Sequence, residues 1–429
     1  MERAVMDLLV KWKERRNRKP LILKGARQVG KTWLMKEFGK KYFKYTAYVN
    51  LDNNKYMKEV FEGDYNIERI LMAVNIETGV KIIAGETLII FDEIQESPRA
   101  ISSLKYFCEN APEYAVIAAG SLLGVAIHKG TSFPVGKVDT IEINPLSFRE
   151  FLSAVGEGGL VKLINSMKIN LMSVYRDRYI DWLKKYYYIG GMPEVVSSFV
   201  ENKDFKEVRY LQNKIIEMYE DDFSKHTTEN ELPRIRMVWN SIPMQLAKEN
   251  KKFLFGKIKE GARAKDFEIA IEWLQDCGLI KKVYKVTKPA MPLKAYIDFS
   301  AFKLYILDVG LLGALSELDA KTILEGNSIF IEFKGALTEQ YVLQQLISDT
   351  DYTPYYYTET KSEGEIDFLI QKEMNVIPIE VKAEENLRAK SLKVYCEKYK
   401  PATAIRTSMS DYRKQDWLTN MPLWTISKI

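Results

Sequence analysis

The sequence is poor in the two residue types that build zinc sites and disulfide frameworks. Its 429 residues include only three cysteines, Cys108, Cys277 and Cys396, which lie far apart and match no metal-ligand spacing. This usage argues against a disulfide scaffold and favours a reducing compartment. The only histidines are His128 and His226, which argues against histidine-rich zinc chemistry and against a Ser-His-Asp arrangement. Chemistry in this chain is therefore expected to depend on carboxylates, lysines and bound metal.

Long apolar runs are also missing. The longest candidate, residues 114–127, is interrupted by Gly120, Ser121 and Gly124 and is too short to span a bilayer. Residues 1–16 form a charged amphipathic pattern with an apolar stretch of only residues 8–10, unlike a signal peptide. We therefore expect no membrane association and a cytoplasmic location.

The composition is that of a globular protein with several domains. Hydrophobic residues make up 46% and charged residues 28% of the chain, which is typical of a folded protein, and the length suits about two to four domains. The net charge of +5 is too small to indicate a partner. However, residues 231–300 hold 14 Lys or Arg against 8 Asp or Glu, and such a local basic excess suits nucleic acid.

Residues 25–32 have the full spacing of a phosphate-binding loop between a strand and a helix. An apolar run precedes them after Pro20, and a helical pattern follows as far as Gly39. In such a loop, backbone N–H groups and the positive end of the helix face phosphate oxygens. We expect Lys31 to reach the β- and γ-phosphates of ATP and Thr32 to offer its hydroxyl to Mg²⁺. The predicted nucleotide-binding residues are Gly25, Ala26, Arg27, Gln28, Val29, Gly30, Lys31, Thr32 and Trp33.

A second strand of this site is predicted at residues 87–91, a continuous apolar run typical of a strand buried on both faces of a parallel sheet. It ends in Asp92 and Glu93, at the sheet edge where ligands of open α/β sheets bind. We expect Asp92 to hold Mg²⁺ and Glu93 to polarise the attacking water. An acidic helix-capping pair is the alternative interpretation.

Two further residues are candidates for the same site. Ser121 follows a predicted strand at residues 115–119, and it either orients the hydrolytic water or caps a helix. Arg149 lies in residues 141–151, which are predicted as a strand, a turn and a helix start. It either faces the γ-phosphate or forms an ion pair on a helix.

In combination, residues 25–32, 91–95 and 145–151 resemble the AAA-type P-loop ATPases of bacteria and archaea that carry a C-terminal restriction-endonuclease-like domain. Residues 190–195, Gly-Gly-Met-Pro-Glu-Val, match the Gly-Gly-x-Pro-Glu turn that recurs in that family. Residues 303–312 match another recurring segment, which we interpret as structural. The expected fold class is α/β. The expected domains are an AAA-type P-loop ATPase domain at 1–158, a helical lid at 159–228, a winged-helix-like domain at 229–312 and an α/β restriction-endonuclease-like domain at 325–429.

The middle of the chain is predicted to be helices followed by a basic module. Residues 160–225 are helical and rich in aromatics, which indicates core packing more often than base stacking. Residues 233–286 follow the order helix, basic loop, helix, strand, as in a winged helix-turn-helix. Its wing carries lysines placed to contact phosphate, Lys281, Lys282, Lys285 and Lys288. Glu268 and Glu272 on the reading helix argue against base-specific readout, so DNA contact and domain packing are both retained as interpretations.

A second group of charged side chains lies in residues 364–382. Side chains alternate along a strand, so Glu380 and Lys382 share one face, and a hairpin register would place Asp367 at the matching end of the neighbouring strand. Asp367 and Glu380 suit Mg²⁺, Lys382 suits positioning and deprotonating water, and Glu339 from a helix at 335–347 would complete the site.

This pattern resembles the PD-(D/E)xK nuclease motif, with Ile366 in place of the usual proline. The alternatives are an ordinary half-buried strand with a Glu–Lys pair, and a nuclease-like domain that binds without cutting.

Two functions are consistent with the sequence. The first is ATP-dependent nucleic-acid processing, in which ATP drives a domain rearrangement and the C-terminal site cuts DNA or RNA. The second is a non-cleaving nucleotide-dependent switch that binds DNA or a protein partner. A small-molecule kinase fits poorly because it would not need residues 230–429. ATP or ADP is the expected ligand, and the sequence does not decide whether the chain forms an oligomer.

Overall fold

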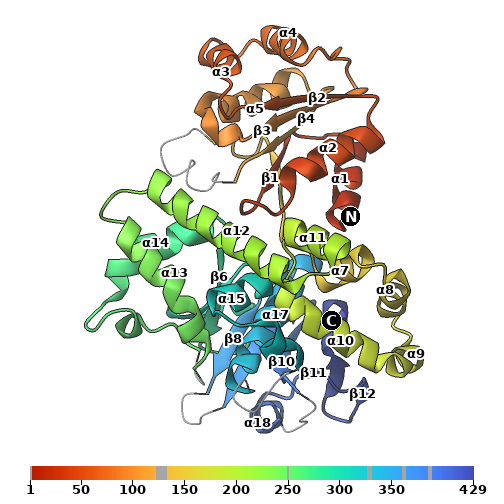
Figure 1. Cartoon of the computed structure of the whole chain (residues 1–429), viewed down its shortest axis with the longest axis vertical. Helices are drawn as coiled ribbons and strands as arrows, with labels where there is room; N and C mark the ends of the chain where they lie inside the picture. Colours follow the sequence, from red (N-terminus) through yellow and green to blue (C-terminus); the bar gives the residue numbers. More distant parts are fainter. Residues whose placement is uncertain (1, 122–132, 249–250, 326–330, 360–363, 385–388) are drawn as a thin grey trace. The chain divides into compact units, whose positions relative to one another are not determined.

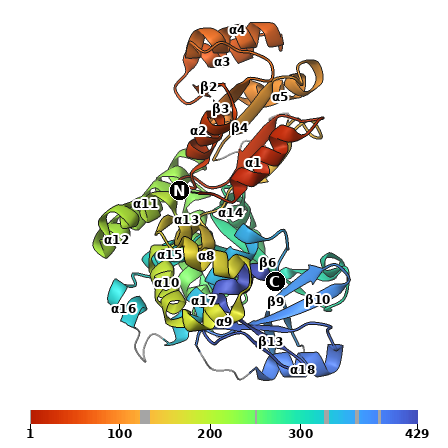
Figure 2. The ribbon, with the colours of Figure 1, turned by 90° about the vertical axis from the view of Figure 1, so that its right-hand side faces the viewer.

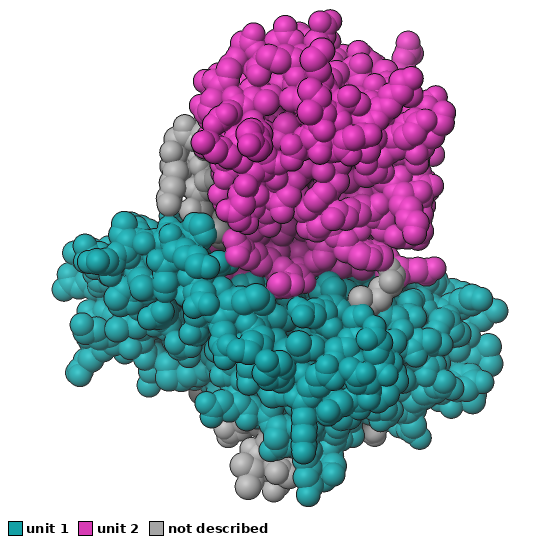
Figure 3. Space-filling model, turned by 45° about the horizontal axis from the view of Figure 1, so that its top comes forward, with its two compact units in different colours: residues 1, 145–275, 280–429 teal, residues 2–144, 276–279 magenta. Residues whose placement is uncertain are grey.

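The computed structural model describes residues 2–121, 133–248, 251–325, 331–359, 364–384 and 389–429; for residues 331 and 332 only the backbone is described. Contacts divide the chain into two units, which Figure 3 colours separately. Unit 2 comprises residues 2–144 and 276–279, and unit 1 comprises residue 1, residues 145–275 and residues 280–429.

Unit 2 is built on a five-stranded parallel sheet with the order β2-β3-β4-β1-β5 (Figure 1). Its strands are β1 (Leu21–Lys24), β2 (Tyr45–Asn50), β3 (Thr87–Asp92), β4 (Ala115–Ala119) and β5 (Asp139–Glu142). As the apolar runs predicted, β3 and β4 are buried along their whole length. Because β4 lies between β1 and β3, the chain segments that follow these three strands meet at one edge of the sheet.

Helices cover both faces of this sheet. The helical elements of the unit are α1 (Val5–Glu14), α2 (Lys31–Tyr42), α3 (Lys55–Glu62), α4 (Ile67–Thr78), η1 (Ile94–Glu96) and α5 (Pro98–Asn110). One apolar core joins α3, α4 and α5 to one face of β2, β3 and β4 through residues such as Phe61, Phe91 and Phe107. Helix α2 contacts the same strands without joining that core, so it covers the other face. Because residues 88–91 of β3 and the whole of β4 are apolar, both faces of the sheet can be buried.

Unit 1 contains an eight-stranded mixed sheet with the order β12-β13-β11-β10-β9-β8-β6-β7. Its strands are β6 (Ile280–Val286), β7 (Ile297–Ile306), β8 (Tyr355–Thr358), β9 (Glu365–Lys372), β10 (Asn375–Val381), β11 (Ile405–Ser408), β12 (Arg413–Lys414) and β13 (Thr419–Pro422). Strands β9 and β10 form an antiparallel hairpin (Figure 2), whereas β10, β11 and β13 run parallel. Strand β6 pairs with β7 on one side and with β8 on the other.

The remainder of unit 1 is mainly helical. Its helices are α7 (Phe148–Ala154), α8 (Gly158–Asn165), α9 (Ile169–Val174), α10 (Arg176–Ile189), α11 (Pro193–Asn202), α12 (Phe205–His226), α13 (Leu232–Leu246), α14 (Ala264–Asp276), α15 (Val309–Leu315), α16 (Ala320–Glu325), α17 (Ile331–Asp349) and α18 (Lys390–Tyr399). Short 3₁₀ turns are η2 (Phe255–Lys257), η3 (Leu293–Tyr296) and η5 (Leu423–Lys428). The order α13, η2, α14, β6 follows the helix, loop, helix, strand order expected from the sequence. The aromatic side chains Tyr186, Tyr187 and Tyr188 are buried, in agreement with core packing.

The two recurring segments at 190–195 and 303–312 are linked by buried hydrogen bonds to Asp308 in unit 1. The Asp308 carboxylate accepts hydrogen bonds from Gly191 N at 2.6 Å, from Leu311 N at 3.1 Å and from Gln344 Nε2 at 2.9 Å. Gly190 has a φ of +75°, and a Cβ at this position would lie 2.0 Å from Asp308 Oδ1. Glycine is therefore required there for space as well as for backbone conformation.

The structure can be compared with two expectations from the sequence, one about disulfides and one about membrane-spanning helices. Cys108, Cys277 and Cys396 are not joined in disulfides. Within the described parts of the chain, every helix is too short or too polar to cross a membrane.

Candidate functional site

The phosphate-binding loop of unit 2 connects β1 to α2. Gly25 has a φ of +146°, and a Cβ there would lie 2.3 Å from Ile143 O, so a larger residue would force the loop away from its neighbour. Gly30 takes a left-handed conformation with a φ of 89° directly before α2. Both glycines thus hold conformations that L side chains rarely adopt. Of the other predicted loop residues, Ala26 and Val29 are buried, Gln28 has a φ of 66° and Trp33 is 44% exposed.

Lys31 points back onto its own loop. Its ammonium donates hydrogen bonds to Gly25 O at 2.8 Å and to Ala26 O at 2.7 Å, and the residue is only 7% exposed. Burial lowers the pKa of Lys31 to about 8, although Glu93 and Asp92 oppose this shift. A cation held in this way lies where the phosphates of a nucleotide would be bound.

Thr32 and Asp92 bring two oxygen donors together, as the sequence predicted for a magnesium site. Thr32 Oγ1 donates to Asp92 Oδ2 at 2.6 Å, and Tyr48 OH donates to the same oxygen at 3.0 Å. A hydroxyl and a carboxylate fit the preference of Mg²⁺ for hard oxygen ligands. Tyr48 is an addition to the predicted site. It lies opposite Ile90 in the β2–β3 register, so strand alternation places it on the face of Asp92.

Glu93 is linked to Ser121 at the end of the neighbouring strand. Its Oε2 accepts hydrogen bonds from Ser121 Oγ at 3.3 Å and from Gln95 Nε2 at 2.6 Å. Arg27 Nε donates to Ser121 Oγ at 3.3 Å. Glu93 has a φ of 50°, an uncommon conformation for a residue other than glycine that is often found at functional sites. The alternative role of Ser121 as a helix cap depends on residues 122–132, which lie outside the described residues.

Arg149 forms an ion pair, which is one of the two roles that the sequence allows for it. Its Nε and Nη2 donate to the two carboxylate oxygens of Asp349 at 3.0 and 2.8 Å, and its Nη1 donates to Asn165 at 2.8 Å. Asp349 is at the end of α17, and its side chain is 2% exposed. The contacts of Arg149 in unit 1 therefore agree with the ion-pair alternative, and the physical reason is that a buried carboxylate needs this guanidinium as its partner.

The β9–β10 hairpin has the register that the sequence predicted. Phe368 pairs with Ile379, so the next step of the ladder sets Asp367 opposite Glu380, and opposite residues of an antiparallel pair share one face. Lys382 Nζ lies 2.7 Å from Glu380 Oε1. Asp367 Oδ2 accepts a hydrogen bond from Val381 N at 2.7 Å. The three predicted residues are thus brought together.

Asp367 and Glu380 are buried, which disfavours the charged forms of their carboxyl groups. Burial raises the pKa of Asp367 well above its usual range, and Glu339 and Glu380 add to this shift. Burial also raises the pKa of Glu380, against the opposing effect of Lys382. Glu380 is 5% exposed, and its Oε2 is a buried oxygen with no hydrogen-bond partner. A bound cation, a water molecule or a proton on the carboxyl group would satisfy such an oxygen.

Glu339 is part of a different arrangement from the one expected. Its carboxylate pairs with the ammonium of Lys251, accepts a hydrogen bond from Tyr305 OH at 3.1 Å and lies 3.7 Å from Lys303 Nζ. Burial opposes ionisation of Glu339, but Lys251 and Lys303 outweigh it and lower its pKa. Lys303 is fully buried and also pairs with Glu365. In the structure Glu339 is thus a lysine-paired carboxylate, and its role in completing a metal site stays a prediction.

Lys251, Lys303 and Tyr305 were not predicted as members of this cluster. A signal for two of them is present in the sequence: Lys303 and Tyr305 lie two positions apart in the buried second half of β7, residues 301–306, so they share a face. Nothing local marks Lys251, which lies 88 positions before its partner Glu339.

The fit of this cluster to a divalent metal is partial. Asp367 and Glu380 supply hard oxygen atoms of the kind that Mg²⁺ prefers, and one of these oxygens lacks a partner. Among the described side chains, however, no three Asp, Glu, His or Cys residues group in a way that could hold a metal ion. The donor set that fits is therefore a pair of carboxylates, with Lys382 beside them.

The basic module shows features of both interpretations retained above. On α14, Glu268 and Glu272 are exposed. On β6, Lys281, Lys282 and Lys285 are half-buried, and Lys282 lies over the ring of Phe302, 5.4 Å from its centroid. Because β6 is flanked by β7 and β8, the predicted wing is an interior strand of the larger sheet.

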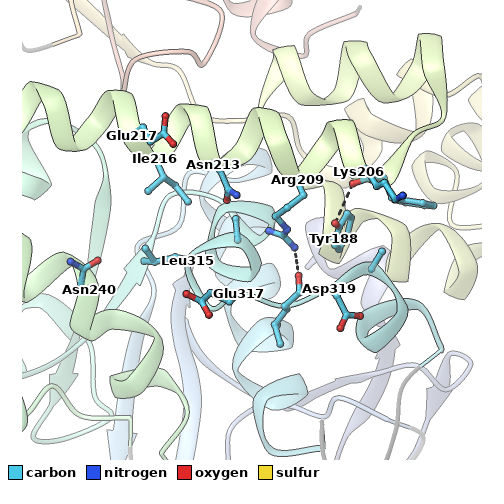
Figure 4. Close-up of a pocket in the computed structure, with 14 residues that line it drawn as sticks. Tyr188, Lys206, Arg209, Asn213, Ile216, Glu217, Asn240, Leu315, Glu317 and Asp319 are labelled. Carbon is cyan, nitrogen blue, oxygen red and sulfur yellow. Dashed lines mark hydrogen bonds between the residues drawn. The ribbon is translucent and has the colours of Figure 1, made fainter.

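A pocket of about 770 Å³ lies in another part of unit 1, beside α12, α15 and α16 (Figure 4). Arg209 projects along it, donates to Leu318 O at 2.6 Å and lies 4.5 Å from the centroid of the Tyr188 ring. Its lining mixes Lys206 with Glu217 and contains none of the predicted site residues. The candidate sites are therefore the phosphate loop and the cluster of Asp367, Glu380 and Lys382.

Comparisons with known proteins identify three regions. Residues 17–152 match the family described as AAA domain, residues 180–322 match a domain of unknown function (DUF8612), and residues 334–426 match another domain of unknown function (DUF4143). No protein of curated function matches the chain.

Matches among solved structures include a Walker-type ATPase of Pyrococcus abyssi, which is 14% identical. The alignment covers 73% of this chain and 95% of that chain with a TM-score of 0.48. The Aeropyrum pernix ORC2 protein in its ADP form is 15% identical, with 75% and 92% covered and a TM-score of 0.30. The Aeropyrum pernix ORC1 protein in complex with DNA is 13% identical, with 73% and 90% covered and a TM-score of 0.27.

The family match at residues 17–152 agrees with the five-stranded parallel sheet and with the loop between β1 and α2. Residues 17–152 thus match the AAA domain family and have the parallel sheet and the loop of a P-loop NTPase fold.

Proposed function

We propose that this protein couples ATP hydrolysis in unit 2 to the binding of nucleic acid by unit 1, and that Asp367, Glu380 and Lys382 form a phosphodiester-cleaving centre. The proposal depends on one observation: two carboxylates stand opposite each other on a hairpin, one of their oxygens is buried without a partner, and a lysine lies 2.7 Å from Glu380.

In unit 2 each residue has a role that follows from its position. Lys31 would contact the β- and γ-phosphates, Thr32 and Asp92 would hold the magnesium ion that accompanies ATP, and Glu93 would orient and polarise the attacking water. Ser121 supports Glu93 through its hydrogen bond. The positive end of α2 adds a favourable interaction with the phosphates.

In unit 1 the roles follow from the shared face of the hairpin. A bound Mg²⁺ would be held by Asp367 and Glu380 and would polarise the phosphate and the water. Against the effect of burial, Glu380 raises the pKa of Lys382, so Lys382 would be protonated and would position that water and the phosphate. The basic segment around β6 supplies the electrostatic attraction for the nucleic-acid backbone.

The test is incubation of the purified chain with supercoiled plasmid in Mg²⁺ or Mn²⁺, with and without ATP. We expect nicked or linear product that disappears in the Asp367→Ala and Lys382→Ala variants. The cleavage proposal fails if no product forms, or if both variants cut as well as the parent protein. The ATPase assignment has its own test, because Lys31→Ala is expected to abolish ATP binding and hydrolysis.

The second candidate is a nucleotide-dependent switch that binds DNA or a protein partner without cutting. It is favoured by the pairing of Glu339 with Lys251 and Lys303, which balances charge inside the cluster without a metal. Salt-dependent DNA binding that differs between ATP and ADP, in the absence of cleavage, would support this function.

A further inference from the structure

Lys251 enters the carboxylate cluster of unit 1 from a distant part of the chain. It lies between α13 and η2, in neither a helix nor a strand, and its ammonium pairs with Glu339 of α17. The Lys251 side chain is 12% exposed and that of Glu339 is 6% exposed. Lys251 thus adds a second cation to a buried carboxylate that already lies 3.7 Å from Lys303 Nζ.

The pairing of Lys251 with Glu339 matters because Glu339 interacts electrostatically with the two proposed metal ligands. Its negative charge acts on Asp367 and on Glu380, and the Lys251 charge also acts on Asp367. Glu339, Asp367 and Glu380 therefore share one electrostatic environment. Three carboxylates of this kind would suit a divalent cation, but no such group of three is found among the described residues.

We propose that Lys251 is an internal cation that withholds Glu339 from the metal site, so that the cluster binds a divalent metal tightly only when Lys251 is withdrawn. This inference depends on the proposed metal site at Asp367 and Glu380. In the resting arrangement only these two carboxylates are available. Withdrawal of one ammonium group would add a third carboxylate and remove a repelling charge.

Lys251 suits this role better than Lys303. Lys303 is fully buried within β7. It pairs with Glu365 and also lies near Glu339, so its charge is shared between two carboxylates. Lys251 is partly exposed and is attached to an irregular segment. The segment is held at Phe253, whose N–H donates to Phe302 O at 2.8 Å, and at Leu254, whose N–H donates to Gln245 Oε1 at 3.2 Å.

The experiment is a Mn²⁺ titration of the nucleotide-free full chain, followed by electron paramagnetic resonance of the free ion. We expect the Lys251→Met variant to bind Mn²⁺ at least about tenfold more tightly than the parent, which corresponds to a change of about 1.4 kcal/mol. The gain in Mn²⁺ affinity must disappear when Lys251→Met is combined with Asp367→Ala. Asp367 belongs to the cluster of unit 1, so this loss would show that the extra Mn²⁺ binds there and not at the nucleotide site.

Two further variants separate charge from packing. Lys251→Arg keeps the positive charge and is expected to bind Mn²⁺ as weakly as the parent. Lys334→Met removes a different lysine of the same unit, paired with Glu384 at 3.0 Å, and is expected to change nothing.

Equal Mn²⁺ affinity in the parent and in Lys251→Met would overturn the inference, whether that affinity is tight or undetectable. If Lys251→Met does not fold, Lys251→Gln is titrated in its place, and the same outcomes apply. Absence of plasmid cleavage would contradict only the proposed function, because the titration contains no nucleic acid.

Discussion

Arg149 and Asp349, 200 positions apart in the chain, form a two-pronged ion pair in which both carboxylate oxygens accept hydrogen bonds from one guanidinium. We predict that Arg149→Met lowers the free energy of unfolding by about 2–4 kcal/mol, because it leaves the Asp349 charge buried without a partner. The folded variant should hydrolyse ATP as fast as the parent. Urea unfolding and steady-state ATPase assays measure the two quantities.

The matched control is Arg178→Met, which removes a more exposed guanidinium paired with Glu157 and should cost no more than about 1 kcal/mol. If Arg149→Met instead slowed ATP hydrolysis by roughly 100-fold or more, which is about 2.7 kcal/mol in barrier, with unchanged stability, Arg149 would be assigned to the γ-phosphate.

Glu93→Gln should separate ATP binding from hydrolysis. The amide keeps the size of the side chain but cannot accept a proton from water, so we expect kcat to fall by about 100-fold or more with ATP affinity within about twofold of the parent. Ser121→Ala removes one hydrogen bond to Glu93 and should lower kcat less, by about tenfold. Phosphate release and nucleotide-binding assays measure these effects.

The control for Glu93→Gln is Glu96→Gln, since Glu96 lies on the same turn and pairs with Lys58. Equal losses of activity in Glu96→Gln and Glu93→Gln would remove Glu93 from the mechanism.

ATP affinity should depend on pH through Lys31. Its pKa in the empty protein is about 8, and phosphate binding favours the protonated lysine. The dissociation constant for a non-hydrolysable ATP analogue should therefore be flat below about pH 8 and rise by up to about tenfold per pH unit above it. Fluorescence titration between about pH 6.5 and 9.5 would measure this dependence. Lys31→Arg should abolish the rise, because arginine stays protonated, and an identical rise in that variant would contradict the prediction.

The same shift has a consequence for the empty protein. The folded state binds fewer protons than the unfolded chain between about pH 8 and the ordinary lysine value of 10.5. Lys31 therefore costs the folded protein stability below about pH 8, and this cost disappears as the pH rises through that window. The sign is opposite to that of a lysine stabilised by an ion pair.

The buried hydrogen bonds of Asp308 should make a large contribution to the stability of unit 1. Asp308→Ala leaves the buried N–H groups of Gly191 and Leu311 without their acceptor, and we predict a loss of about 2–4 kcal/mol in the free energy of unfolding. Chemical denaturation measures the loss. Asp319→Ala is the control because Asp319 also caps a helix, through Thr322 N at 2.7 Å, but is exposed; about 1 kcal/mol is expected there. Similar losses in both variants would mean that Asp308 is only a helix cap.

The parts of the molecule that could be predicted from sequence are those governed by neighbours in the chain. The loop at 25–32 is recognisable because its glycines, its lysine and the flanking strand and helix are contiguous. The pairing of Asp367 with Glu380 follows from strand alternation and from a short hairpin, in which a single turn sets the register.

The parts that could not be predicted depend on contacts between distant segments. The sequence places Glu339 on a helix correctly, but its partner Lys251 lies 88 positions away, and no local pattern distinguishes this lysine from its neighbours. Two roles are equally consistent with the sequence around Arg149 because its partner lies on a helix 200 positions later. The contact of Tyr48 with Asp92 escapes prediction for a similar reason, since it joins two strands through a register that the sequence alone does not supply.

The continuity of β6 with β8 determines how this protein can be divided for experiments. Strand β8 pairs with β9 on one side and with β6 on the other, so a fragment that starts after residue 312 would lose β6 and β7 and expose the backbone donors and acceptors of β8. An open strand edge of this kind favours aggregation. Fragments intended to contain the Asp367 cluster should therefore begin before Ile280, and a fragment that also retains Lys251 must begin earlier still.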